Sequence, residues 1–169
     1  QNKDVIDELS HNNVYVSHLA EYMKNKCGFP IYKNTTITYI ESGEKMFEKL
    51  KNELRNARHF IFMEYFIINN GRIWGEILEI LKQKAAEGLD VRLLYDGMGS
   101  QLILPDDYHK QLGRFNIKCR IFNSFKPFLS SSQNNRDHRK IVVIDNKVGF
   151  TGGLNFADEY INRIVRFGY

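Results

Sequence analysis

The sequence predicts an α/β fold in which a mixed, mostly parallel sheet is flanked by helices on both faces. Segments of strand-like composition alternate with segments whose apolar residues recur at helical spacing, the order typical of such folds. Two runs, residues 60–68 and 141–144, are apolar enough to be strands buried inside the sheet. No internal repeat suggests a solenoid or a duplicated architecture within these 169 residues.

The composition is that of one globular domain. Hydrophobic residues make up 43% and charged residues 26%, and the length allows a substantial core. The net charge of +4 suits an anionic partner, but it does not choose between phospholipid headgroups and nucleic acid. Cys27 and Cys119 lack metal-ligand spacing, so we expect free thiols. No apolar run reaches the roughly 18 residues that a membrane-spanning helix requires.

The chain divides into an amino-terminal lead-in with one helix, residues 1–34, and an α/β part, residues 35–169. We expect residues 1–10 to be loose and Asn13 to cap a helix that ends near Lys26, before Gly28. Further helices are expected over 44–57, over 73–87, within 101–113 and from Asn155 or Phe156. Strands are expected over 35–40, 60–68, 91–96, 117–122, 141–144 and 147–151. The long polar stretch 123–136 predicts a functional lid or a disordered loop.

The chemistry is concentrated around the strand at 141–144. His138 and Lys140 are two residues apart, so they share a face at the start of this strand. An imidazole beside an ammonium group suits a substrate with an anionic oxygen, because the Lys holds that oxygen while the His attacks, or exchanges a proton at, the atom that carries it. Gly152 and Gly153 allow close approach of an anion to the backbone, and Asn155 follows with an amide donor.

Three further polar residues are candidates for a supporting role. Glu64 lies in the middle of an apolar run, where an unpaired carboxylate is costly, so it needs a partner. That partner is either an active-site cation or imidazole, or a structural hydrogen bond. Asp96 ends the strand at 91–96 and Ser100 follows it, at the edge of the sheet where α/β proteins place ligand groups.

The string from His138 and Lys140 to Asp145, followed by Gly152, Gly153 and Asn155, resembles the phospholipase D superfamily and its His-Lys-Asp motif. Over residues 135–161 it is more particularly similar to bacterial cardiolipin synthases, and the strings at 63–68 and 91–100 add to this resemblance. The resemblance covers roughly residue 35 to the end of the chain.

The resemblance implies a metal-free phosphodiester transfer with no cofactor. His138 would be the nucleophile that forms a phosphohistidine, and Lys140, Asn155 and the two glycines would bind the phosphate oxygens. Asp145 belongs with His138 and Lys140 in the motif. It lies an odd number of residues from His138, so alternation turns it to the opposite face and favours an orienting role.

The family uses two such motifs, whereas this chain has one, because His11, His18, His59 and His109 lack a Lys two residues on. The second motif would come from a missing second half or from a second subunit. We expect the first arrangement: the amino-terminal half of a longer bacterial enzyme, with membrane-spanning segments before Gln1. The substrate would be phosphatidylglycerol at the cell membrane, while this piece alone would be soluble and inactive.

Three functions remain open at this point. The favoured one is a phosphatidyltransferase that joins two phosphatidylglycerols into cardiolipin and glycerol. A phospholipase D hydrolase, or a homodimeric phosphodiesterase or endonuclease, would use the same chemistry, although nucleic acid is disfavoured by the thin basic charge. A non-catalytic domain that binds acidic headgroups would have no need of His138.

Overall fold

The computed structural model describes residues 2–101, 103–124 and 134–165, and it divides into two compact units, residues 1–39 and 40–169. The first unit holds α1 (Asn2–Asn12) and α2 (Val14–Cys27). Asn13 caps α2, its side-chain oxygen accepting hydrogen bonds from the amides of residues 15 and 16, and Gly28 ends it with a φ of 72°. The prediction for α2 is confirmed. The prediction of a loose lead-in over residues 1–10 is wrong, because α1 is helical. The predicted strand over 35–40 is also wrong, since these residues form no strand.

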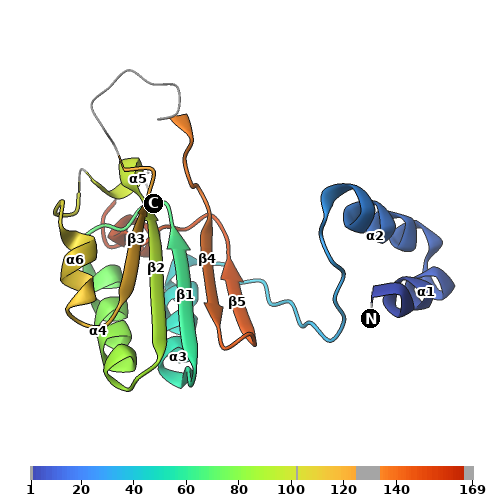
Figure 1. Cartoon of the computed structure of the whole chain (residues 1–169), viewed down its shortest axis with the longest axis horizontal. Coiled ribbons are helices and arrows are strands. Elements are labelled where there is room, and N and C mark those ends of the chain that lie inside the picture. The colour runs from blue at the N-terminus through green and yellow to red at the C-terminus, as the bar shows by residue number, and fades with distance from the viewer. Residues whose placement is uncertain (1, 102, 125–133, 166–169) are drawn as a thin grey trace. The chain divides into compact units, whose positions relative to one another are not determined.

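The second unit is built on a five-stranded mixed sheet with the strand order β3-β2-β1-β4-β5 (Figure 1). Its strands are β1 (Phe60–Tyr65), β2 (Asp90–Asp96), β3 (Lys118–Phe122), β4 (Lys140–Ile144) and β5 (Val148–Thr151). The β1–β2 and β2–β3 pairs are parallel, whereas β1–β4 and β4–β5 are antiparallel. Strands β1, β2, β3 and β5 therefore run one way and β4 alone runs the other, which confirms the mixed α/β sheet. Strand β1 ends at Tyr65, three residues before the predicted end.

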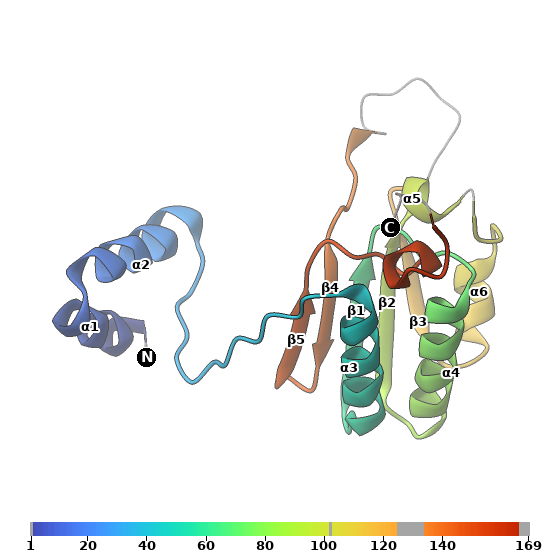
Figure 2. The same cartoon turned by 180° about the vertical axis from the view of Figure 1, so that it is seen from behind.

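The helices of this unit pack on one face of the sheet, as Figure 2 shows from behind. They are α3 (Gly43–Asn56), α4 (Arg72–Ala86), α5 (Gly97–Gln101) and α6 (Tyr108–Gly113). In β1 the residues Ile61, Met63 and Tyr65 are buried beneath the helices, whereas Phe62 and Glu64 on the other face are half-buried. The expectation of helices on both faces is therefore not met by the described residues of this unit. Apolarity alone does not distinguish one covered face from two when the strand carries aromatic residues on both.

The polar end of the sheet lies where β1 and β2 end and β4 begins. Figure 1 shows α5 at the carboxyl end of β2, with the segment that leads into β4 at the same end. After β5, the expected helix is only a 3-10 turn, η2 (Asp158–Ile161). The middle of the expected lid, residues 125–133, lies outside the described residues. Within the described ranges, no helix is long and apolar enough to cross a bilayer.

Candidate active site

His138 and Lys140 lie together at the start of β4, and Phe66 contacts both of them. The rings of His138 and Phe66 have centroids 4.8 Å apart, and the Lys140 ammonium lies 5.1 Å from the centroid of the Phe66 ring. Lys140 Nζ also donates a hydrogen bond of 2.6 Å to the His138 carbonyl oxygen. Phe66 was not predicted as a site residue, because it reads as part of an apolar run. The ring contact links the two motif residues to the end of β1.

Lys140 is buried while His138 is exposed. Only 4% of Lys140 is accessible, and burial lowers the pKa of its ammonium group. Its partner across the β1–β4 ladder is Tyr65, the last residue of β1. Within the described residues this cation makes one hydrogen bond, to a carbonyl, so two more N–H groups face no described acceptor and suit an anion. The buried ammonium also acts in surroundings that screen it poorly. The exposed imidazole of His138 stands beside it, open to a substrate.

Asn155 is buried beside the end of β1 and its amide is already partly engaged. Its Oδ1 accepts a hydrogen bond from the Ile67 amide at 3.0 Å, and its Nδ2 donates to the Tyr160 hydroxyl at 2.9 Å. It does not start a helix as expected, because η2 begins three residues later. One amide hydrogen of Asn155 remains for an anion, so its predicted donor role depends on that single hydrogen.

Gly152 and Gly153 form an exposed bend directly after β5. A Cβ placed on either residue would meet no atom within 4 Å, and neither has a positive φ. The fold itself therefore does not require glycine here. The space next to both residues is available to a ligand, which is compatible with the predicted close approach of an anion.

Asp145 sits at the opposite end of β4 from His138. The two are seven residues apart on an extended chain, roughly 20 Å. Its carboxylate accepts hydrogen bonds from the amides of Arg58, His59 and Phe60 at 2.8, 2.9 and 2.8 Å. Burial opposes ionisation of Asp145, but these amides outweigh it and lower its pKa. This geometry joins β4 to the start of β1. It argues against a catalytic role for Asp145 and favours the predicted orienting role.

Glu64 finds its partners on the open face of the sheet, not at His138. Arg139 Nη2 lies 2.7 Å from Glu64 Oε1, and Arg139 Nε donates to Asp137 Oδ1 at 2.9 Å. Burial, a hydrogen bond with Asp137 and the charge of Asp137 raise the pKa of Glu64 to about 7. Asp137 Oδ2 is buried with no hydrogen-bond partner among the described residues, and the raised pKa of the neighbouring Glu64 favours its protonated form. The motif's central Arg139 therefore serves this carboxyl pair, on the side of β4 opposite Lys140.

Asp96 and Ser100 are both fully buried and bind backbone groups. Asp96 Oδ1 accepts hydrogen bonds from the amides of Met98 and Gly99, at 2.8 and 3.0 Å. Ser100 Oγ donates to the Phe66 carbonyl oxygen at 3.1 Å and accepts from the Ile68 amide at 3.0 Å. Both residues thus support the end of the sheet that carries the site, and neither is exposed to a substrate.

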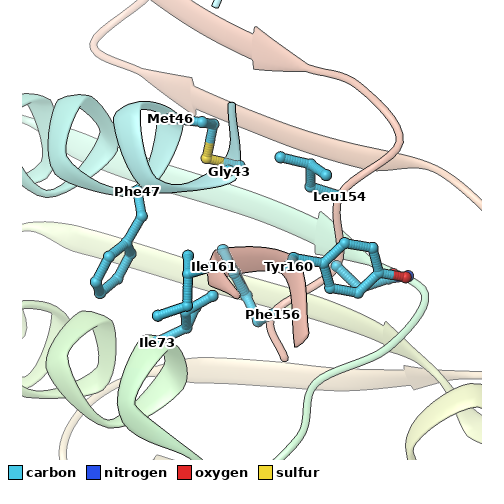
Figure 3. A pocket seen from close by; sticks show the side chains of 9 residues that line it. Gly43, Met46, Phe47, Ile73, Leu154, Phe156, Tyr160 and Ile161 are labelled. Atoms are coloured by element: carbon cyan, nitrogen blue, oxygen red, sulfur yellow. The ribbon is translucent and has the colours of Figure 1, made fainter. Parts of the chain in front are cut away.

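Two hollows of this unit differ greatly in size. The cavity in Figure 3, between α3, α4 and η2, has a volume of only about 10 Å³, scarcely enough for one water. A wider groove of about 520 Å³ crosses the open face of the sheet and is lined by Phe62, Glu64, Arg92 and Arg120, among others. Neither hollow has His138 on its wall. In the described ranges, no cluster of His, Cys, Asp or Glu could hold a metal ion.

The fold is that of the phospholipase D family. NucT from Helicobacter pylori superposes with a TM-score of 0.52 at 17% identity, covering 70% of this chain and 71% of that one. Nuc from Salmonella typhimurium, a phospholipase D family member, superposes with a TM-score of 0.50 at 19% identity over 67% and 66% of the two chains. At these identities the likeness concerns the fold alone.

Sequence comparison then gives the particular family. Residues 50–164 match the model described as "Cardiolipin synthase, PLD-like domain", and the chain belongs to this family. An uncharacterized protein of Streptococcus mutans is 51% identical over 98% of this chain and 36% of its own length. Cardiolipin synthases of Halalkalibacterium halodurans and Staphylococcus aureus are 38% and 34% identical, over 99% and 96% of this chain. The chain spans about one third of the length of these relatives.

Proposed function

We propose that this chain is part of a phosphatidyltransferase of the cardiolipin synthase type. It would join two phosphatidylglycerols into cardiolipin and release glycerol. The observation that carries this proposal is the pair formed by the exposed imidazole of His138 and the buried ammonium of Lys140, bridged by Phe66. The relatives named cardiolipin synthase supply the substrate class.

The reaction proceeds in two displacements at phosphorus. A ring nitrogen of His138 forms a bond to phosphorus while the P–O bond to glycerol breaks, and the departing oxygen takes a proton from an acid in the second motif. A hydroxyl of the second phosphatidylglycerol then forms the new P–O bond while the P–N bond breaks, and its proton returns to that acid. Both steps develop negative charge on the phosphoryl oxygens. The Lys140 ammonium, the remaining Asn155 amide hydrogen and the backbone near Gly152 and Gly153 stabilise this charge.

The second motif is proposed to come from the rest of the same polypeptide. This chain has one His-x-Lys pair and spans about a third of its named relatives, which leaves room for a second half. A second identical subunit is the alternative. A lipid substrate also places the whole enzyme at the bacterial cell membrane, with the catalytic part at the bilayer surface.

The test is turnover of labelled phosphatidylglycerol by the full-length enzyme. We expect His138→Asn to abolish cardiolipin formation and the base-stable, acid-labile label that a phosphohistidine retains. His59→Asn is the matched control, because His59 is an exposed histidine preceding the other end of β1. Unaltered turnover in the His138 variant would contradict the proposal. Phosphatidic acid as the product, in place of cardiolipin, would show a hydrolase with the same site chemistry.

A further inference from the structure

We propose that Asp96 is a positioning residue that fixes the backbone immediately before His138; its kinetic consequence rests on the proposed function. Asp96 is the last residue of β2 and has no exposed surface. Its carboxylate accepts four hydrogen bonds, two from α5 and two from the segment that leads into β4. A fully buried carboxylate that satisfies both of its oxygens in this way joins two parts of the chain rigidly.

The join crosses a strand. Strand β1 lies between β2 and β4 in the sheet, so no ladder hydrogen bond connects β2 with the motif strand. Asp96 Oδ2 nevertheless accepts a hydrogen bond from the Asp137 amide at 2.9 Å. Its Oδ1 lies 3.3 Å from Arg136 Nη1, which supplies a positive charge. The carboxylate thus reaches past the end of β1 to the two residues before His138.

His138 depends on this contact because it lies outside the sheet. The β1–β4 ladder ends at the Tyr65–Lys140 pair, and β4 begins at Lys140. The backbone of His138 is therefore held from one side by Lys140 and from the other by Asp137. Asp137 is itself fixed by the hydrogen bond that its backbone amide donates to Asp96 and by its side-chain contact with Arg139. Removing the acceptor oxygen of Asp96 releases the backbone amide of Asp137, and with it the chain on the amino-terminal side of His138.

The same carboxylate also supports the ring that packs on His138. Asp96 caps α5, and α5 carries Ser100, whose hydroxyl binds the Phe66 carbonyl oxygen. The packing is tight: a Cβ on Gly99 would lie 2.3 Å from that same carbonyl oxygen. Phe66 is the residue whose ring lies against His138. Asp96 therefore contacts both supports of His138: the backbone before it, through Asp137, and the Phe66 ring, through α5.

Asp96→Asn is the variant that separates these contacts. An amide oxygen can still accept from Met98 and Gly99, but the amide NH₂ then faces the Asp137 N–H, donor against donor. We expect kcat of the full-length enzyme to fall about ten- to a hundredfold with KM nearly unchanged, as displaced catalytic groups do. Hydrogen exchange should become faster in peptides from 134–140 and stay unchanged in 141–151. Ile144→Val, at the far end of β4, is the control for general loss of stability.

The outcomes are separable. A variant with normal kcat, or with kcat lowered only in proportion to the unfolded fraction as in Ile144→Val, would overturn the positioning role. Should the wild-type enzyme make no cardiolipin, the proposed function fails, while the exchange measurement still decides whether Asp96 orders residues 134–140. Should Asp96→Asn not fold, Ser100→Ala replaces it. That variant removes the Ser100 hydroxyl, which donates to the Phe66 carbonyl oxygen and accepts from the Ile68 amide, while Asp96 stays in place. A several-fold loss of kcat supports the proposal and an unchanged kcat refutes it.

Discussion

Replacing Asp145 should cost stability and not chemistry, because its carboxylate binds three backbone amides at the end of β4 remote from His138. The matched variant is Asp145→Asn, since Asn tolerates the left-handed φ of 54° that this turn requires. It keeps one acceptor oxygen and turns an NH₂ group toward an amide. Two of the three amides, those of Arg58 and His59, belong to exposed residues and regain water when released.

The expected magnitude follows from these contacts. A hydrogen bond to a charged group contributes about 1.5–3 kcal/mol, and hydration of two of the three amides offsets part of the sum. We therefore expect Asp145→Asn to lower the free energy of unfolding by about 2 kcal/mol, and Asp145→Ala by about 1 kcal/mol more from left-handed strain. At about 2–4 °C per kcal/mol, the midpoint of thermal unfolding of the Asn variant falls by about 4–8 °C.

Denaturant unfolding of the 169-residue chain, followed by the fluorescence of its single, buried Trp74, measures this change. The pKa of Asp145 is lower in the folded chain than in the unfolded one. Its contribution is therefore present above the ordinary carboxyl pKa and is lost as the pH falls through the folded value. The difference in unfolding free energy between wild type and Asp145→Asn should therefore disappear at acid pH. A variant as stable as wild type but without turnover would refute the reasoning and return Asp145 to the catalytic residues.

Two further predictions concern Glu64, on the open face of the sheet, and Lys140, beside His138. Glu64, with a folded pKa of about 7, binds a proton more tightly folded than unfolded, so its contribution is full below the unfolded pKa and is lost as the pH rises toward 7. The stability of Glu64→Gln, measured by urea unfolding from pH 5 to 8, should decline less over this range than that of wild type. The control variant Glu79→Gln, at an exposed site, should show the same pH dependence of unfolding free energy as wild type. Parallel pH curves for wild type and both variants would contradict the prediction. Lys140→Met keeps the apolar stem but removes the buried ammonium. The free energy of unfolding should therefore change by less than about 1 kcal/mol, while turnover of the full-length enzyme falls at least about a hundredfold. Turnover close to wild type would exclude Lys140 from charge stabilisation.

The residues themselves determined the local structure. The β-branched run after Lys140 forms β4, and alternation along it places Lys140, Val142 and Ile144 on the helix-covered side. Asn13 and Gly28 mark the ends of α2 because capping depends on side chains within a few residues of each other. The family, too, could be recognised from one contiguous string, since the spacing of its motif is itself a property of the chain.

The tertiary structure alone decided which polar groups meet. Asp96 binds the Asp137 amide 41 residues away, and Glu64 pairs with Arg139 instead of His138. The expected strand at 35–40 failed because strand-forming residues make a strand only where a partner edge is available.

The bare face of the sheet has the same origin. A strand's alternation fixes which side chains point each way, but burial depends on elements that pack from elsewhere in the chain. The sequence by itself therefore determined the family, the motif strand and the shared side of His138 and Lys140. Only tertiary packing decided which partners the carboxyl groups of Asp96 and Glu64 find, because those contacts join residues tens of positions apart and no local pattern encodes them.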